Sequence, residues 1–204
     1  MANVKICGIT NLEDAADAAK LGADYLGFNF YKKSPRFIDA EIAQKVLNNL
    51  GFSTKKVAVF VNEDLDKAGS IVKQLNFDLI QLHGDESPEY CAQLKKKAKK
   101  QVIKAFRIKD KLNLNDFMSY DADYYMFDAH KEGQFGGTGK TFDWSLLNGI
   151  KKPFFLSGGL NPGNVKEAIK MVNPFAVDVA SGVESKIGKK DYKKMKDFID
   201  AAKH

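Results

Sequence analysis

Short apolar runs alternate with segments of helical periodicity along the whole chain. The runs are about four to seven residues long, the usual length of a strand that is buried on both faces, and turn-forming residues bound them. They predict strands at residues 4–7, 25–30, 56–61, 79–82, 102–106, 124–128, 153–156 and 175–179.

Helix signals fill the intervals between these runs. Residues that cap helices, such as Asn11, precede the periodic segments, and Pro88 stands at the first position of one of them. The predicted helices cover 11–21, 39–50, a segment from 62 or 64 to 75, a segment from 88 through the lysines at 95–100, 111–119, a short piece from 143, 161–172 and the chain after 189.

The strand–helix units are short, about 25 residues each on average, close to the smallest size of a strand, its helix and two loops. The pattern therefore predicts an α/β fold, a closed (β/α)8 TIM barrel that residues 1–204 form as a single domain. An open doubly wound sheet would more often have a G-x-G-x-x-G turn after its first strand. Here the glycines gather after the last three predicted strands instead.

Composition is typical of a soluble globular chain, with 44% hydrophobic and 28% charged residues. Only two cysteines occur, Cys7 and Cys91, and no secretory signal pattern precedes the first strand. We therefore expect reduced thiols and a cytoplasmic location. No apolar run approaches the roughly 18 to 20 residues that span a bilayer, so membrane insertion is not expected.

The net charge of +6 suits either a nucleic acid or an anionic small substrate. Almost all of the basic charge is lysine, and the densest run, at 95–100, lies at a predicted helix end where cations suit the helix dipole. Arginine occurs only as Arg36 and Arg107. Because arginine forms planar, two-pronged contacts with carboxylates and phosphates, these two positions are the better binding candidates.

In such a barrel the C-terminal ends of the strands meet at one mouth, where catalytic groups are found. Cys7 ends the first predicted strand and shares a face with Lys5. As a base it needs a thiolate, which Lys5 or nearby helix N-termini would favour, whereas the alternative is a small buried apolar residue. The other chemical side chains at or after strand ends are Arg36, His83, Arg107, Asp128 and Asp178.

Asp128 ends an aromatic and aliphatic strand, where an unpaired carboxylate is unfavourable. It is therefore either hydrogen-bonded to a loop or available as an acid. Glycine turns follow the last two strands, where such barrels bind phosphate with backbone N–H groups, although glycines also simply make tight turns. The turns contain Gly158, Gly159, Ser181 and Gly182.

A metal site is not expected. The three histidines, His83, His130 and His204, have no short paired spacing, and the chain has no C-x-x-C motif. We interpret His83 as a hydrogen-bonding residue of the mouth.

Motifs at the predicted strand ends make the whole chain resemble one known family. They are V-K-I-C-G-I-T from residue 4, G-F-N-F from 27 with K-S-P-R from 33, Q-L-H-G-D from 81, G-G-T-G-K from 136 with F-D-W from 142, L-S-G-G-L from 156 and D-V-A-S-G-V-E from 178. In this order they resemble the phosphoribosylanthranilate isomerase family. The resemblance implies an Amadori rearrangement of N-(5'-phosphoribosyl)anthranilate to 1-(o-carboxyphenylamino)-1-deoxyribulose 5-phosphate, a step of tryptophan biosynthesis, without a cofactor.

Position by position, the resemblance also implies roles for individual residues. Cys7 matches the general base that takes the C2' proton, Asp128 the general acid that protonates the ring oxygen, and Arg36 the residue that holds the anthranilate carboxylate. Asp178 matches a carboxylate near the sugar hydroxyls. His83 is expected to contact the substrate because of its place at the mouth, apart from the resemblance. The phosphate cradle corresponds to Gly158, Gly159, Ser181 and Gly182. One departure is Ala180, where the family has serine, so a hydroxyl contact is lost.

The glycine-rich segment 129–142 is predicted to be a lid over the reactive intermediate or, alternatively, an ordinary long surface loop. The expected partner is a small-molecule substrate, with no nucleic acid and no membrane. The sequence leaves the oligomeric state open, and a monomer is the working expectation.

Two rival functions share some of these features. Another sugar-phosphate barrel, such as a pentulose-phosphate epimerase, would share the phosphate turns but would use paired acids or histidine–metal chemistry, for which the histidines are too few. A non-catalytic nucleic-acid or phosphate-binding protein would need a contiguous basic face with interleaved aromatics. The lysines here are scattered over predicted helices instead.

Overall fold

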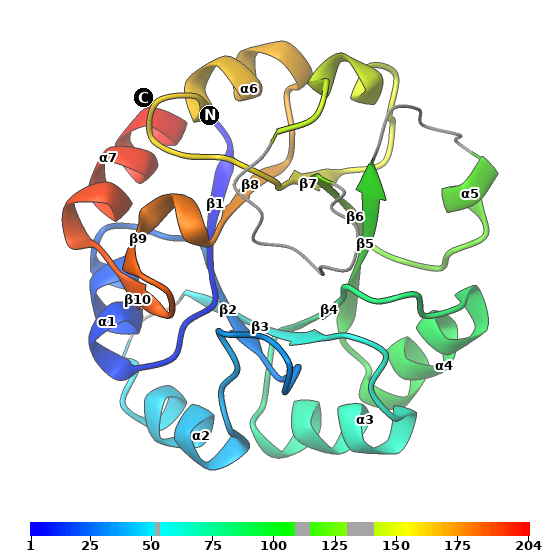
Figure 1. Ribbon diagram of the computed structural model, residues 1–204. Helices are drawn as coiled ribbons and strands as arrows, with labels where there is room; N and C mark the ends of the chain where they lie inside the picture. The colour runs from blue at the N-terminus through cyan, green and yellow to red at the C-terminus, as the bar shows by residue number, and fades with distance from the viewer. Residues whose placement is uncertain (52–53, 109–114, 130–140) are drawn as a thin grey trace.

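The computed structural model describes residues 1–51, 54–108, 115–129 and 141–204, and its main sheet closes into a barrel (Figure 1). Each strand pairs in parallel with the next, and the last pairs with the first. This confirms the predicted (β/α)8 TIM barrel. The strands are β1 (Asn3–Cys7), β2 (Tyr25–Asn29), β3 (Lys55–Phe60), β4 (Leu79–Leu82), β5 (Gln101–Ile108), β6 (Tyr124–Ala129), β7 (Phe154–Leu156) and β8 (Ala176–Val179).

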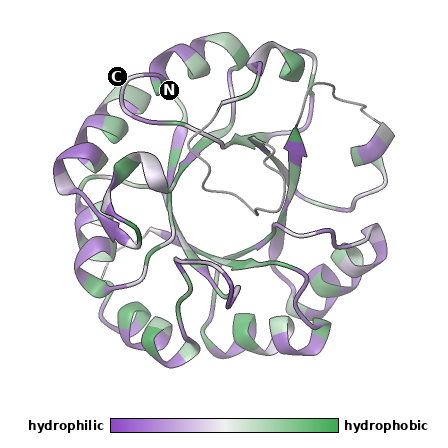
Figure 2. Ribbon diagram, viewed as in Figure 1, coloured by the Kyte–Doolittle hydropathy of each residue, from purple (hydrophilic) through white to green (hydrophobic). Residues whose placement is uncertain are grey.

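Helices surround the barrel, and their hydrophilic residues gather on the outer side (Figures 1 and 2). The first begins at the predicted cap, where Asn11 Oδ1 accepts from Asp14 N at 2.9 Å. Directly before Pro88, Ser87 Oγ accepts from Tyr90 N at 3.2 Å and caps another helix. No helix in the described ranges is long and apolar enough to cross a bilayer. The helices are α1 (Leu12–Lys20), α2 (Ala40–Asn48), α3 (Leu65–Gln74), α4 (Pro88–Ala98), α5 (Asn115–Met118), α6 (Val165–Val172) and α7 (Tyr192–Lys203), with 3-10 turns η1 (Trp144–Leu147) and η2 (Ser181–Val183).

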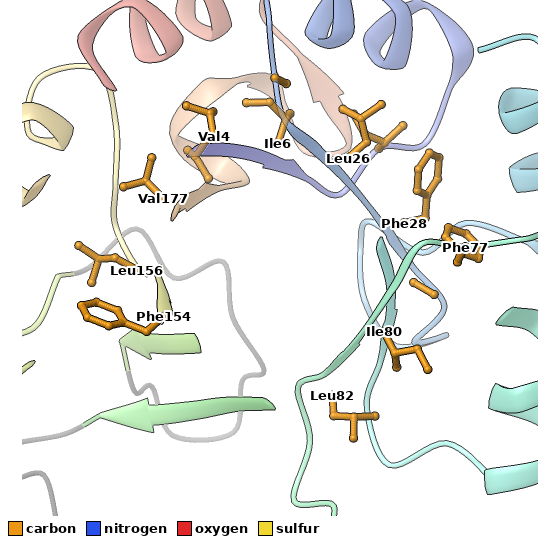
Figure 3. Close-up of a cluster of buried hydrophobic side chains, with 14 of the residues drawn as sticks. Val4, Ile6, Leu26, Phe28, Phe77, Ile80, Leu82, Phe154, Leu156 and Val177 are labelled. Atoms are coloured by element: carbon orange, nitrogen blue, oxygen red, sulfur yellow. The ribbon is translucent and has the colours of Figure 1, made fainter. Parts of the chain in front are cut away.

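The strands are buried on both faces because helices cover the outside of the barrel and side chains fill the inside. Val4, Ile6, Leu26 and Phe28 belong to the large cluster that the strands share with the helices (Figure 3). The alternate positions build a second cluster from strand residues alone, including Val57. This two-sided burial explains why the strands read as nearly continuous apolar runs.

The barrel interior changes character along its axis. Aromatic rings fill its N-terminal end, where the ring of Phe155 lies 5.4 Å from that of Tyr25 and 5.6 Å from that of Tyr124. Nearer the mouth, the inward positions carry Lys5 and Gln81, which are both buried. An apolar plug therefore closes one end, and polar chemistry is confined to the other.

Three segments depart from the predicted pattern. The helix expected at 111–119 is described only as α5, because 109–114 lie outside the described residues, and the helix expected from 143 is the 3-10 turn η1. Between β8 and α7 the chain forms η2 and a hairpin of β9 (Glu184–Lys186) and β10 (Lys189–Lys190). The hairpin was not predicted because its strands are short and mostly polar, so no apolar run marks them.

The interior plug makes a stability prediction. Phe155→Ala should lower the free energy of unfolding by about 3–5 kcal/mol, because it removes a fully buried ring and leaves a cavity. Chemical denaturation measures the change. The control is Tyr192→Ala, which truncates an aromatic ring that is 53% exposed and should change the same quantity by less than about 0.5 kcal/mol. Equal losses in the two variants would contradict the proposed plug.

Candidate active site

A cavity opens at the C-terminal mouth of the barrel, where the sequence predicted the chemistry. It encloses about 660 Å³, including the part open to solvent, which suits a small-molecule ligand. The ends of all the barrel strands except β5, or the loops that follow them, contribute to its lining. The predicted site residues that line it are Cys7, Arg36, His83, Asp128, Gly158, Gly159, Asp178 and Ser181, and Gly182 follows directly.

A buried ion pair forms the floor of this cavity. Lys5 Nζ lies 2.6 Å from Asp178 Oδ1, and the two residues are direct partners in the β1–β8 pairing. Ser157 Oγ donates to the other oxygen, Asp178 Oδ2, at 3.0 Å. Burial works against the charged form of Lys5, but the charges of Asp178 and Cys7 raise its pKa, so Lys5 is an ammonium at neutral pH.

The thiol of Cys7 lies beside this ammonium. A Cβ added to Gly27 would sit 2.8 Å from Cys7 Sγ and 2.9 Å from Lys5 Nζ, so the missing side chain of Gly27 makes room for both. Burial raises the pKa of Cys7, and the positive charge of Lys5 opposes that shift without cancelling it. Lys5 thus acts in the direction that the sequence suggested, toward the thiolate, but desolvation outweighs the nearby cations.

A hydrogen-bonded chain crosses the opposite side of the mouth. His83 Nε2 lies 3.0 Å from Asp128 Oδ2, and His83 Nδ1 lies 2.8 Å from Gln81 Nε2. We assign the Gln81 amide nitrogen as the donor and His83 Nδ1 as the acceptor. The ring hydrogen of His83 is then on Nε2, which donates to Asp128 Oδ2. The other carboxylate oxygen of Asp128, Oδ1, lies beside Gly158. A Cβ added to Gly158 would come within 2.9 Å of this oxygen. One oxygen of Asp128 is thus held, and the other faces the glycine turn.

The glycine turns supply unpaired backbone donors. Gly158 and Gly159 have φ angles of +90° and +66°, which glycine adopts without strain. The carbonyl of Gly159 accepts from Asn164 Nδ2 at 3.0 Å, which fixes the turn. Within the described residues, no acceptor is recorded for the N–H groups of Gly158, Gly159, Ser181 and Gly182. Such converging N–H groups form an anion site.

Arg36 reaches the cavity from the loop after β2. Ser34 Oγ accepts from Arg36 N at 3.1 Å and from Asn29 Nδ2 at 3.1 Å, which folds this loop back onto its strand. The guanidinium makes a two-pronged ion pair with Glu184, from Nε to Oε1 at 2.7 Å and from Nη2 to Oε2 at 2.8 Å. Burial opposes the carboxylate of Glu184, but Arg36 and Lys190 lower its pKa, so it is ionised.

Some predicted candidates lie elsewhere. Arg107 pairs with Asp85 and lines a separate cavity with Lys104. His130 and most of the predicted lid, 130–140, lie outside the described residues. Among the described residues, no cluster of three or more His, Cys, Asp or Glu side chains could hold a metal ion.

Sequence reasoning missed three polar residues of the site. Gln81, Glu184 and Lys190 were not among the predicted site residues. All three are buried, although Lys190 and Glu184 lie in the hairpin, which no hydrophobic pattern marks. The signal for Gln81 was its position, since it stands at an inward place of a strand that is otherwise apolar.

Comparison with known proteins identifies the family. A model of the N-(5'-phosphoribosyl)anthranilate (PRA) isomerase family matches residues 4–201. The N-(5'-phosphoribosyl)anthranilate isomerase of Geobacter metallireducens is 43% identical over 205 residues, with 100% of both chains covered. The chain belongs to the phosphoribosylanthranilate isomerase family. It is therefore an isomerase of tryptophan biosynthesis, as the sequence motifs implied.

Solved structures of this family share the fold. Phosphoribosyl anthranilate isomerase from Thermotoga maritima is similar with a TM-score of 0.91 and 41% identity, covering 100% of this chain and 99% of its own. A second phosphoribosyl anthranilate isomerase structure, with a TM-score of 0.87, 39% identity and the same coverage, holds reduced 1-(o-carboxyphenylamino)-1-deoxyribulose 5-phosphate.

The turn after β7 makes a prediction about activity. In Gly158→Ala the new Cβ would lie 2.5 Å from Ala129 N, so the turn and the adjacent Asp128 must shift. We expect isomerase kcat/KM to fall by about 10- to 100-fold, because small displacements of reacting groups have effects of this size.

Gly149→Ala is the matched control for this variant. Gly149 also has a positive φ, +92°, but a Cβ there meets no described atom within 4 Å. It should lower the free energy of unfolding by about 1 kcal/mol and leave kcat/KM unchanged. Similar kcat/KM losses in the two variants would refute a specific role for the Gly158 turn.

Proposed function

We propose that the chain converts N-(5'-phosphoribosyl)anthranilate into 1-(o-carboxyphenylamino)-1-deoxyribulose 5-phosphate in this cavity, with Cys7 as general base and Asp128 as general acid. The observation that carries the assignment is that one cavity is lined by a thiol, a carboxyl group and unpaired backbone donors. Its function as an isomerase follows from the family, and the roles of individual residues are the proposal.

The first step is the opening of the aminoribose ring. Asp128 donates a proton to the ring oxygen as the bond between that oxygen and C1' breaks, which leaves a cationic imine between C1' and the anthranilate nitrogen. Because Asp128 Oδ2 accepts from His83, the transferred proton is assigned to Oδ1. The other oxygen stays held by His83, so the acid keeps a fixed orientation.

The second step is proton removal at C2'. Cys7 takes the C2' proton, and the electron pair of the C–H bond neutralises the imine to give an enolamine. A proton then adds at C1' while the C2' hydroxyl releases its own proton and becomes a carbonyl, so the number of protons is unchanged and the rearrangement is complete. The ammonium of Lys5 supports this step because it stabilises the thiolate form of Cys7.

Three anchors hold the substrate in this scheme. The phosphate lies on the N–H groups of the turns after β7 and β8, which needs no side-chain hydroxyl at Ala180. Arg36 binds the anthranilate carboxylate, a task that suits a planar two-pronged donor. His83 and Asp178 face the sugar hydroxyls. The supporting observation is that these side chains line the same cavity as Cys7.

The remaining assignments concern the whole chain. We propose that residues 1–204 form one domain and that the chain acts as a monomer, because every group used above comes from one chain. The Thermotoga maritima relative is dimeric, in contrast. A cytoplasmic location agrees with two free cysteines, which a reducing compartment maintains.

The assignment of acid and base predicts the effect of two substitutions. Cys7→Ala and Asp128→Asn should each lower kcat for phosphoribosylanthranilate by about 10²- to 10⁴-fold, which is the usual contribution of one general acid or base. The fluorescence change that accompanies substrate consumption follows the reaction. Cys91→Ala, at a cysteine buried away from the cavity, is the control and should keep the parent kcat. Near-parent turnover in either test variant would refute that residue's role, and no turnover by the parent would refute the activity.

The position of Lys5 beside Cys7 predicts how the pH dependence of kcat/KM changes when the lysine is removed. The base must be deprotonated, so kcat/KM rises as pH rises through the pKa of Cys7. Lys5→Met removes the opposing positive charge and should move this limb by about one to three units toward higher pH. The control is Lys104→Met, which removes another buried lysine that is ion-paired, with Glu86, outside the Cys7 cavity. A loss in Lys5→Met that is equal at every pH would indicate a purely structural role.

A further inference from the structure

Glu184 is a buried carboxylate that the proposed reaction does not use, although it touches one of the substrate anchors. It is 8% exposed and lies at the start of β9, directly after η2. Its two oxygens accept from Nε and Nη2 of Arg36. The contact joins the loop after β2 to the segment after β8, 148 residues apart in the chain.

The geometry of this ion pair determines which N–H donors of Arg36 are left for another acceptor. A guanidinium has five N–H donors arranged in a rigid plane, and a carboxylate can bind two of them along one edge. Glu184 occupies the edge formed by Nε and Nη2. The end of the guanidinium, with Nη1 and the second hydrogen of Nη2, has no recorded partner among the described residues. This free end is again a two-pronged site, and Arg36 lines the cavity.

Two lysines besides Arg36 hold Glu184 in place. Lys190 Nζ donates to Glu184 Oε1 at 3.1 Å and to the carbonyl of Ala180 at 3.1 Å. Lys194 Nζ donates to the backbone carbonyl of Glu184 at 2.9 Å, and Asp14 accepts from Lys190 N at 2.8 Å. The hairpin is therefore tied to helices α1 and α7, which gives the carboxylate little freedom to move.

The charges in this cluster also suit an anion. Arg36 and Lys190 flank one carboxylate, and all three side chains are largely buried. Glu184 holds the two basic side chains together, and burial lowers the pKa of Lys190 although the charge of Glu184 opposes that shift. The hydrogen bond from Glu184 raises the pKa of Arg36, so the free end of the guanidinium still offers positive charge and two donors to a second carboxylate.

We infer that Glu184 is the positioning residue that orients Arg36, so that the Nη1/Nη2 edge of the guanidinium receives the carboxylate of the substrate. The inference rests on the proposed function, in which Arg36 is the carboxylate anchor. Selectivity for an ortho-carboxylated aromatic amine then depends on Arg36 and Glu184 together, and on the hairpin that holds Glu184. No atom of Glu184 takes part in proton transfer.

The test compares two substrates, N-(5'-phosphoribosyl)anthranilate and the analogue made from aniline, which lacks the carboxylate. In Glu184→Gln, one acceptor becomes an NH2 group that faces a guanidinium N–H, so the guanidinium must turn. We expect KM for the anthranilate substrate to rise about 10- to 100-fold, the effect of losing a charged hydrogen bond, with kcat little changed. KM for the aniline analogue should stay within about twofold of the parent value.

Two further variants separate positioning from general damage. Glu86→Gln alters another buried glutamate, paired with Lys104 and outside the Cys7 cavity, and should leave the ratio of the two KM values unchanged. Glu184→Asp keeps the charge but shortens the side chain by one methylene, so it should raise the KM for the anthranilate substrate as well. It serves as the test variant if Glu184→Gln does not fold.

Arg36→Met distinguishes failure of this inference from failure of the proposed function. Loss of the preference for the carboxylated substrate in both Arg36→Met and the Glu184 variants supports the inference. If Arg36→Met loses the preference and the Glu184 variants keep it, Glu184 does not orient Arg36 and the anchor role of Arg36 stands. If Arg36→Met keeps the preference, both assignments fall.

Discussion

The structure depends on one ion pair, between Lys5 and Asp178, at the seam where the first strand meets the last. Removing either partner would leave a buried charge without compensation, which typically lowers stability by about 3–5 kcal/mol. The pair also separates the aromatic plug at one end of the barrel from the reactive mouth at the other. The ammonium of Lys5, which pairs β1 with β8, also lies beside Cys7. One positive charge therefore contributes both to the closure of the barrel and to the ionisation of the thiol.

Burial places a limit on this arrangement. It raises the pKa of Cys7 despite Lys5, so in the free protein the thiol form is favoured more than in an ordinary cysteine. In the proposed reaction, ring opening generates a cationic imine next to the thiol, and a new positive charge favours the thiolate. The base is then most effective when the intermediate is present. Buried charges also matter at the rim of the cavity. There Lys190 holds Glu184, and Glu184 orients the guanidinium of Arg36.

Much of the fold could be predicted because its strands are buried on both faces and stand out as apolar runs, of which β4 was predicted with its observed bounds. The mouth could also be predicted, since every parallel strand delivers its last residue to the same end. The hairpin of β9 and β10 could not, because polar contacts such as Thr10 Oγ1 to the carbonyl of Gly188 hold it. The partners of Arg36 and Asp128 were missed for a similar reason, because strand pattern does not specify side-chain pairing between distant segments.

The central claim is that a base and an acid, Cys7 and Asp128, act on one sugar held between the phosphate turns and Arg36. The most direct measurement is a crystal structure of this chain with reduced 1-(o-carboxyphenylamino)-1-deoxyribulose 5-phosphate. We expect the phosphate on the N–H groups of Gly158, Gly159 and Ser181, the carboxylate on Arg36, and C2' next to Cys7 Sγ. A ligand with its phosphate away from these turns, or with C2' closer to Asp128 than to Cys7, would contradict the assignment.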